Sequence, residues 1–177
     1  MRIIDLPIEI TELLETLNSP LILKRHLTIV HATAFNLLAR LKDEWPVINL
    51  KNELILFGAA THDIGKIKIT NELFAAGKKH ELAGMEILIN QGYKKEKSRF
   101  AQTHGDWKVE NREIEDLLVS LSDNIWKGKR IDDLEEMIIL KLSAILESDY
   151  WEVYEKFDII LSEIATGADK RLNWQGQ

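Results

Sequence analysis

The sequence contains no cysteine, and this absence removes several classes of chemistry. Disulfide bonds, thiolate nucleophiles and cysteine-ligated zinc are all excluded, and a chain without them suits a reducing compartment. Long apolar runs are also missing: the longest extends from Leu54 to Ala60, whereas a membrane-spanning helix needs about 18 residues. Charged residues at Arg2, Asp5 and Glu9 interrupt any segment resembling a signal peptide. We therefore predict a cytoplasmic protein with no membrane partner.

The sequence also lacks the short motifs of several large enzyme classes. It has no G-x-S-x-G serine elbow, no glycine-rich phosphate-binding loop and no dinucleotide-binding fingerprint. The zinc-protease pattern H-E-x-x-H fails as well, because Gly84 stands where the second histidine would follow His80-Glu81. A formal net charge of −6 disfavours nucleic acid as a partner. What remains is chemistry based on histidines and carboxylates.

Helical periodicity runs through nearly the whole sequence. Between Pro20 and Leu41, apolar residues recur every three or four positions, and Trp45-Pro46 predicts the end of that helix. Leu54 to His62 is apolar on almost every side, which predicts a buried central helix. The segment from Ile64 to Lys79 has glycines near both ends and is predicted to be a loop. Further helices are predicted over Ile8 to Leu17, His80 to Asn90, Phe100 to His104, Ile114 to Ile125, Leu134 to Ile145 and Tyr150 to Ile164.

These segments predict an all-α fold. The chain of 177 residues has the length of one domain, so we expect a single helical bundle over residues 1–177. The periodicity predicts about seven or eight helices in it. A chain of this length buries enough surface to fold without a metal, so a metal site in it would serve function rather than folding.

The residues with the most chemical capacity are spread over separate predicted helices. His62 and Asp63 are adjacent at the end of the most apolar helix, where an uncompensated carboxylate is costly to bury. Helical bundles build metal sites from side chains that several helices direct at one point. Imidazole and carboxylate together suit Mn, Fe, Ni, Zn or Mg, so we expect a divalent metal as cofactor. The remaining candidates are His26, His80, His104 and Asp123.

The order H…HD…H…H…D, with Thr61-His62-Asp63-Ile64-Gly65-Lys66 at its centre, resembles the HD superfamily of metal-dependent phosphohydrolases. Arg25-His26 followed by Val30 resembles the first helix of that family. His80 with Gly84 resembles the third ligand position, and Leu121-Ser122-Asp123 resembles the final aspartate helix. The resemblance covers about residues 21–130. It leaves an N-terminal helix in residues 1–19 and C-terminal helices in 131–177, which we expect to pack on this core.

The resemblance implies a role for each matching position. His26, His62, Asp63 and Asp123 match the ligands of one metal ion, and His80 and His104 match the histidines of members that hold a second ion or bind phosphate. Asp63 would bridge two ions, and the family's water-activating chemistry makes it a catalytic residue. Lys66 matches the HD-x-x-K lysine that faces the substrate phosphate, which implies both a catalytic and a substrate-binding role.

His31 competes with His26 for the first ligand position. The two side chains project about 140° apart on a helix, so they do not reach one ion together. Val30 and Ala34 fit the family's apolar stripe when counted from His26, whereas the same offsets from His31 give Phe35 and Ala39. We favour His26 and keep His31 in reserve.

Basic residues gather beside the same motifs. Lys66 lies in the predicted loop, and Lys127 and Arg130 follow Asp123. We therefore expect a locally positive surface at the entrance to the site, although the protein as a whole is acidic. We expect a small phosphorylated substrate that resembles a nucleotide, cleaved as a phosphomonoester or phosphodiester, with Lys66, Lys127 and Arg130 as substrate-binding residues.

Two other functions are compatible with the same residues. A non-catalytic HD module would sense a nucleotide or dock a partner, but its usual mark is a lost ligand, and every ligand is present here. A di-iron oxygenase on the same fold shares the ligand set, so the sequence does not separate it from a hydrolase. The substrate, the metal, the choice of one or two ions and the oligomeric state stay open, because helix-rich surfaces are also compatible with a dimer.

Overall fold

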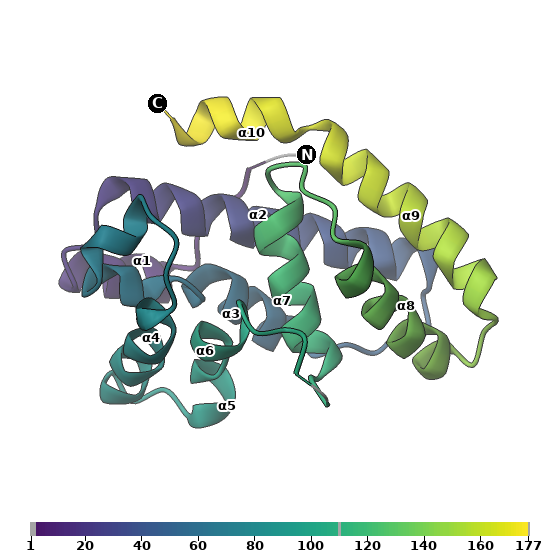
Figure 1. The fold of residues 1–177 in the computed structure, drawn as a ribbon, viewed down its shortest axis with the longest axis horizontal. Coiled ribbons are helices and arrows are strands. Elements are labelled where there is room, and N and C mark those ends of the chain that lie inside the picture. The colour runs from purple at the N-terminus through teal and green to yellow at the C-terminus, as the bar shows by residue number, and fades with distance from the viewer. Residues whose placement is uncertain (1–2, 110, 177) are drawn as a thin grey trace.

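The computed structural model describes residues 3–109 and 111–176, so residues 1, 2, 110 and 177 of the predicted domain lie outside the described residues. Over the described part the chain forms helices and no strand, which confirms the all-α fold class (Figure 1). The α-helices of this part are α1 (Ile8–Thr16), α2 (Leu21–Glu44), α3 (Asn52–Thr61), α4 (Lys79–Asn90), α5 (Lys95–Ser98), α6 (Phe100–Thr103), α7 (Ile114–Ile125), α8 (Asp132–Leu146), α9 (Tyr150–Thr166) and α10 (Ala168–Gln175).

The long helices follow the apolar periodicity closely. Helix α2 extends to Glu44 and ends at Trp45, whose extended backbone precedes Pro46 as predicted. Single-turn helices α5 and α6 have four residues each, and the other α-helices of the described part have eight or more. Helix α10 was not predicted, because the segment after Thr166 is polar and has no apolar repeat. Among the described helices, none combines the length and apolar character that crossing a membrane requires.

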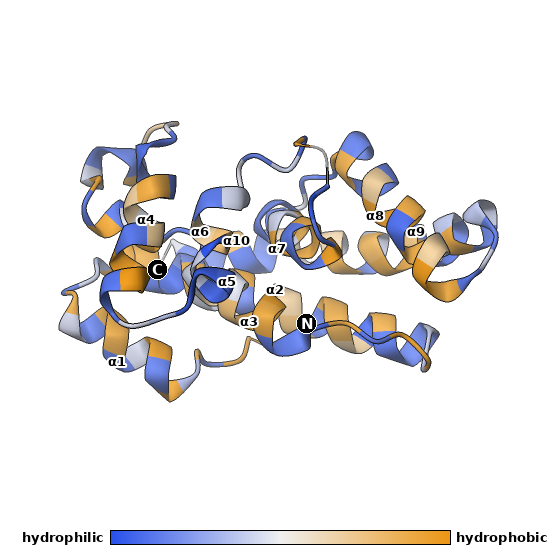
Figure 2. Cartoon of the chain, turned by 90° about the horizontal axis from the view of Figure 1, so that it is seen from below, coloured by the Kyte–Doolittle hydropathy of each residue, from blue (hydrophilic) through white to orange (hydrophobic). Residues whose placement is uncertain are grey.

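Two clusters of buried apolar residues hold the helices together. The first joins α2, α3, α7, α8 and α9 through residues such as Leu41, Leu117 and Phe157. The second joins α1, the start of α2, and α4 through residues such as Leu14 and Leu88. Hydrophobic and hydrophilic residues alternate along most helices in Figure 2, as expected for helices with one face on a core.

Helix α3 contributes to both clusters, which explains why it is apolar on almost every side. Ile55 and Ala59 belong to the first cluster, and Phe57 and Ala60 belong to the second. The first residues of α3 are exposed, but the helix is buried from Phe57 onward, so its C-terminal end lies in the interior. The residues that follow α3 are therefore buried regardless of their polarity.

The segment predicted as a loop after α3 contains two short 3₁₀ helices, η1 (Ile64–Ile67) and η2 (Thr70–Leu73), so the prediction of a loop was wrong there. Helix η1 packs on the N-terminal half of α4 at very close range. A Cβ at Gly65 would lie 1.9 Å from the carbonyl oxygen of His80 and 2.5 Å from the backbone nitrogen of Gly84. Only glycine allows this approach, and the approach brings the start of α4 next to the end of α3.

We predict that Gly65→Ala destabilises the fold by about 1–3 kcal/mol, because the added methyl overlaps backbone that cannot move aside. Urea unfolding followed by circular dichroism measures this loss. The matched control is Gly176→Ala, whose added Cβ would lie 3.5 Å from its nearest neighbour, an ordinary contact. Equal stability of the two variants would contradict the tight η1–α4 contact.

Candidate metal centre

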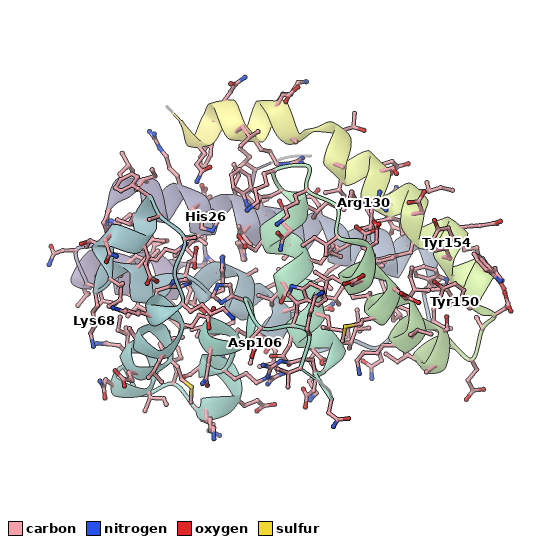
Figure 3. All side chains as sticks on the ribbon, viewed as in Figure 1. His26, Lys68, Asp106, Arg130, Tyr150 and Tyr154 are labelled. Carbon is pink, nitrogen blue, oxygen red and sulfur yellow. The ribbon has the colours of Figure 1, made fainter. Side chains whose placement is uncertain are left out.

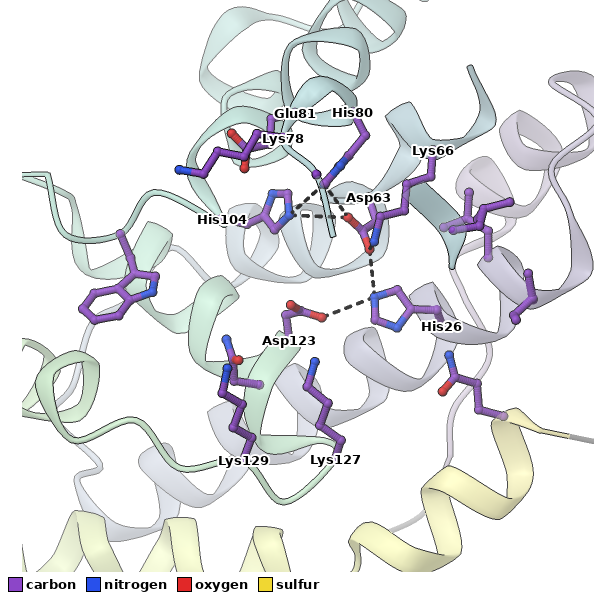
Figure 4. Close-up of a pocket in the computed structure, with 18 of the residues that line it drawn as sticks. His26, Asp63, Lys66, Lys78, His80, Glu81, His104, Asp123, Lys127 and Lys129 are labelled. Atoms are coloured by element: carbon purple, nitrogen blue, oxygen red, sulfur yellow. Dashed lines mark hydrogen bonds and ion pairs between the residues drawn. The ribbon is translucent and has the colours of Figure 1, made fainter. Parts of the chain in front are cut away.

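Six histidine and aspartate side chains from five parts of the chain converge on one point, and all of them except His62 line one pocket (Figure 4). His62 immediately follows α3 and Asp63 comes next, and the two are 0% and 2% exposed. The others come from α2, from the first turn of α4, from the residue after α6, and from α7: His26, His80, His104 and Asp123. The pocket has a volume of about 440 Å³ and is open to solvent on the side of Asp123.

The carboxylate of Asp63 lies at the centre of the cluster. Its Oδ2 atom is 3.1 Å from Nε2 of His26 and 3.6 Å from Nε2 of His62. Its Oδ1 atom is 3.1 Å from Nε2 of His80 and 3.4 Å from Nε2 of His104. The cluster therefore has two halves, each with two imidazoles, and Asp63 belongs to both.

Asp123 completes the half that contains His26 and His62. Its Oδ1 atom lies 3.3 Å from Nε2 of His26 and 3.4 Å from Nε2 of His62. Its side chain is 21% exposed, whereas that of Asp63 is 3% exposed, so Asp123 forms part of the wall of the open pocket. This half offers two nitrogen and two oxygen atoms, a donor set that suits the borderline divalent ions.

In three of the imidazoles, the hydrogen bond made by Nδ1 indicates that Nε2 is the nitrogen directed at the centre of the cluster. Nδ1 of His62 lies 3.1 Å from the carbonyl oxygen of Ala59, and Nδ1 of His104 lies 3.1 Å from that of Ala101. Nδ1 of His80 lies 2.6 Å from a carboxylate oxygen of Glu72. Oxygen acceptors require a proton on Nδ1, so in the neutral imidazoles Nε2 carries a lone pair directed into the cluster.

This arrangement fits a bound cation. In the neutral tautomers just described, the Nε2 atoms of His80 and His104, 3.4 Å apart, both present a lone pair, so neither donates a hydrogen bond to the other. Oδ1 of Asp63 is buried between them and has no hydrogen-bond partner among the residues that the structure describes. Buried lone pairs repel unless something positive lies among them, and ring nitrogens held from behind in this way are typical of metal ligands.

The pKa values show how strongly the cluster attracts positive charge. Burial lowers the pKa of His26, but the hydrogen bonds and charges of Asp123 and Asp63 outweigh burial and raise it to about 9. Burial raises the pKa of each of the two aspartates, but the surrounding imidazoles outweigh it and hold both values well below the ordinary range. For His62 burial prevails and lowers the pKa. Both carboxylates are thus ionised at neutral pH, as ligands for a cation must be.

Glu72 supports the site and was not identified from the sequence. Its side chain, which is 4% exposed, accepts hydrogen bonds from the backbone nitrogens of Lys79 and His80 at 3.2 and 3.0 Å. It therefore caps the N-terminus of α4 while it also binds the ring of His80. No local motif marks such a cap, because Glu72 lies eight residues before His80 in a segment that looked like a loop.

The structure brings only some of the predicted basic residues to the pocket. Nζ of Lys66 lies 2.6 Å from Oδ2 of Asp63, and Lys127 lines the pocket wall together with Lys78 and Lys129. Arg130 is not brought there. Its guanidinium pairs with Glu135 and Asp158, at 2.7 Å each, on the side of α8 and α9 (Figure 3).

The two candidates for the first ligand position have different surroundings. His26 lies in the cluster, as described above, whereas His31 neither lines the pocket nor belongs to either group of potential ligands in the described residues. His31 is 4% exposed, and its Nδ1 atom has no hydrogen-bond partner within residues 3–109 and 111–176. Burial lowers the pKa of His31 to about 4, so this imidazole is neutral in the folded protein.

We predict that His31→Leu makes folding less sensitive to acid. The unfolded chain protonates this imidazole near its ordinary pKa of 6.5, but the folded chain does so only near 4, so its contribution to stability is lost as the pH falls through this window. Between about pH 7.5 and pH 5, the parent chain should lose about 2 kcal/mol more stability than the variant. Urea unfolding at both pH values measures the difference. Equal losses would show that His31 is protonated in the folded chain.

Comparison with known proteins supplies the family. A family model described as HD domain matches residues 30–127, which is more than half of the chain. The matched segment contains five of the six clustered residues and begins shortly after His26. Searches of curated proteins and of solved structures found no match. The match confirms the resemblance carried by the HDIGK segment, and the chain belongs to the HD domain family.

Proposed function

We propose that this protein is a metal-dependent phosphohydrolase that cleaves a phosphate ester in a small, nucleotide-like substrate. HD domains are typically metal-dependent phosphohydrolases, and this chain has the His and Asp cluster that such activity needs. The observation that carries the proposal is the position of Asp63, a buried carboxylate with one oxygen toward each of two histidine pairs. That arrangement suits two metal ions that share one bridging carboxylate.

The ligands would divide between two ions. His26, His62, Asp63 and Asp123 would hold the first, and Asp63, His80 and His104 would hold the second. When bound, such ions lower the pKa of a coordinated water and neutralise charge on the phosphoryl oxygens.

The remaining polar residues act on the substrate. Lys66 is held by Asp63 at the pocket wall, and its ammonium group stabilises the negative charge that builds up on the phosphoryl group during cleavage. Lys78, Lys127 and Lys129 surround the opening and attract an anion to a pocket whose floor is otherwise acidic. The indole of Trp107 also lines the pocket and offers a flat surface for a base.

The first test is the metal content of protein purified without chelator or metal-affinity resin. We expect about two equivalents of a divalent ion in the parent chain, about one in His104→Ala, and almost none in Asp63→Asn, since the amide keeps the shape but removes the bridging charge. Elemental analysis measures all three. His31→Leu is the control and should keep the parent content.

A metal-free parent chain would still be tested with added Mn²⁺ or Mg²⁺ and a generic phosphodiester, because weakly held ions are lost in purification. Absence of hydrolysis under those conditions would contradict the proposed enzymatic activity and favour a non-catalytic binding module. Iron that supports oxygen consumption without phosphoester cleavage would favour the oxygenase.

The second test concerns Lys66. We expect Lys66→Met to lower kcat about 100-fold while the metal content stays unchanged, because the variant loses charge stabilisation but no ligand. The matched control is Lys68→Met, since Lys68 is exposed and does not line the pocket. Steady-state kinetics on the best phosphoester found by screening measure both variants. An unchanged kcat in Lys66→Met would exclude a catalytic role for this lysine.

A further inference from the structure

The C-terminal helix α10 lies outside the segment matched by the family model, yet it reaches the pocket. Gln175, the last residue of α10, is one of the lining residues. The helix passes over the end of α7, close to the turn that leads to α8 (Figure 1). Helix α10 is therefore not part of the family pattern, yet it lies near the half of the cluster that contains Asp123.

The buried guanidinium group of Arg171 connects α10 to that end of α7. The side chain of Arg171 donates from Nε to the carbonyl oxygen of Trp126, and from Nη2 to that of Ile125 at 3.3 Å. Nη2 also donates to the carbonyl oxygen of Ile164, at 2.7 Å, in the last turn of α9. Arg171 is 3% exposed and forms no ion pair with any residue that the structure describes.

The three carbonyl groups explain how this charge is held without a carboxylate. The last carbonyls of a helix have no partner within the helix, and they lie at the negative end of its dipole. Arg171 binds such groups at the ends of both α7 and α9. Because the guanidinium has several donors in a fixed plane, it holds the two helix ends in one orientation, which a single ammonium group cannot do.

The turn after α7 is shaped to receive α10. Gly128 has a φ of +77°, and a Cβ there would lie 3.0 Å from the Cβ of Ala168, the first residue of α10. The turn thus lies directly against the start of α10. Lys127 and Lys129, which line the pocket, flank this glycine.

The contact leads from Arg171 to the ligands of one half of the cluster. Trp126 is 4% exposed, and its ring lies edge-to-face with the ring of His26 at a centroid distance of 5.6 Å. Trp126 also follows Asp123 by less than one helical turn. Fixing the carbonyl of Trp126 therefore fixes both the surface on which His26 rests and the end of the helix that carries Asp123.

We propose that Arg171 is a positioning residue for the metal site formed by His26, His62, Asp63 and Asp123, and that it leaves the His80 and His104 half of the cluster unaffected. This inference rests on the proposed function, since it concerns the affinity of the first of the two ions. It gives the C-terminal helix a role in the site rather than only in the fold.

The test is calorimetric titration of Mn²⁺ into the full chain after removal of metal. In a His104→Ala background only the His26 half remains, and there Arg171→Met should weaken Mn²⁺ binding about 10-fold or more. In a His26→Ala background the remaining site uses His80 and His104, and Arg171→Met should change its affinity less than 2-fold. This difference between backgrounds is a coupling that general destabilisation does not produce.

The matched control for stability is Leu161→Ala, which removes a fully buried side chain from α9 without touching the pocket. It should lower the melting temperature and leave both Mn²⁺ affinities unchanged. If Arg171→Met does not fold, Arg171→Lys takes its place with the same expectation, because one ammonium group cannot bind all three carbonyls.

The outcomes separate the two proposals. A parent chain that binds no Mn²⁺ overturns the proposed function, and this inference with it. A parent chain that binds Mn²⁺, combined with equal effects of the folded Arg171 variant in both backgrounds or no effect in either, overturns only the role of Arg171.

Discussion

The buried carboxylate of Asp63 is the constraint on which the rest of the structure depends. An ionised group at 2% exposure is tolerated only when positive charge or hydrogen-bond donors surround it. Here the imidazole of His26, whose pKa is raised to about 9, and the ammonium group of Lys66 lie against Oδ2, and a cation between the histidine pairs would meet the rest of that need. The imidazoles are in turn held from behind by backbone carbonyls and by Glu72. The cluster is therefore a polar network within an apolar bundle, and its members hold their positions only together.

The packing of the apolar helices places the residues of this polar network where they can meet. Helix α3 lies between two core clusters, so its C-terminal end places His62 and Asp63 in the interior. The close packing at Gly65 then brings α4 and His80 within reach of Asp63. Each feature has its own constraint: the first buries the charge of Asp63, and the second allows only glycine at position 65. Together they hold the His and Asp side chains in an arrangement that would need little change to receive an ion.

The charge distribution separates the floor of the pocket from its opening. The floor has two carboxylates with strongly lowered pKa values, and the opening has lysines from the segments after α3 and α7. A protein with a net charge of −6 thus presents a positive entrance over a negative centre. That arrangement suits a cation held below and an anionic substrate drawn in above. Arg130, although close in sequence to Lys127 and Lys129, instead joins α8 to α9.

The sequence by itself determined the helical class, the end of α2 at Trp45-Pro46 and the family, because these depend on local periodicity, on proline sterics and on the HDIGK segment. It also indicated His26 over His31, because the apolar stripe of the HD family fits when it is counted from His26. Tertiary structure alone decided the contacts of Glu72, Arg130 and Arg171. Each of these side chains acts on backbone or charges at least five residues away, and α10 has no apolar repeat to announce it. Long polar side chains have many partners of similar energy, so their choice depends on which distant groups the folded core brings within reach.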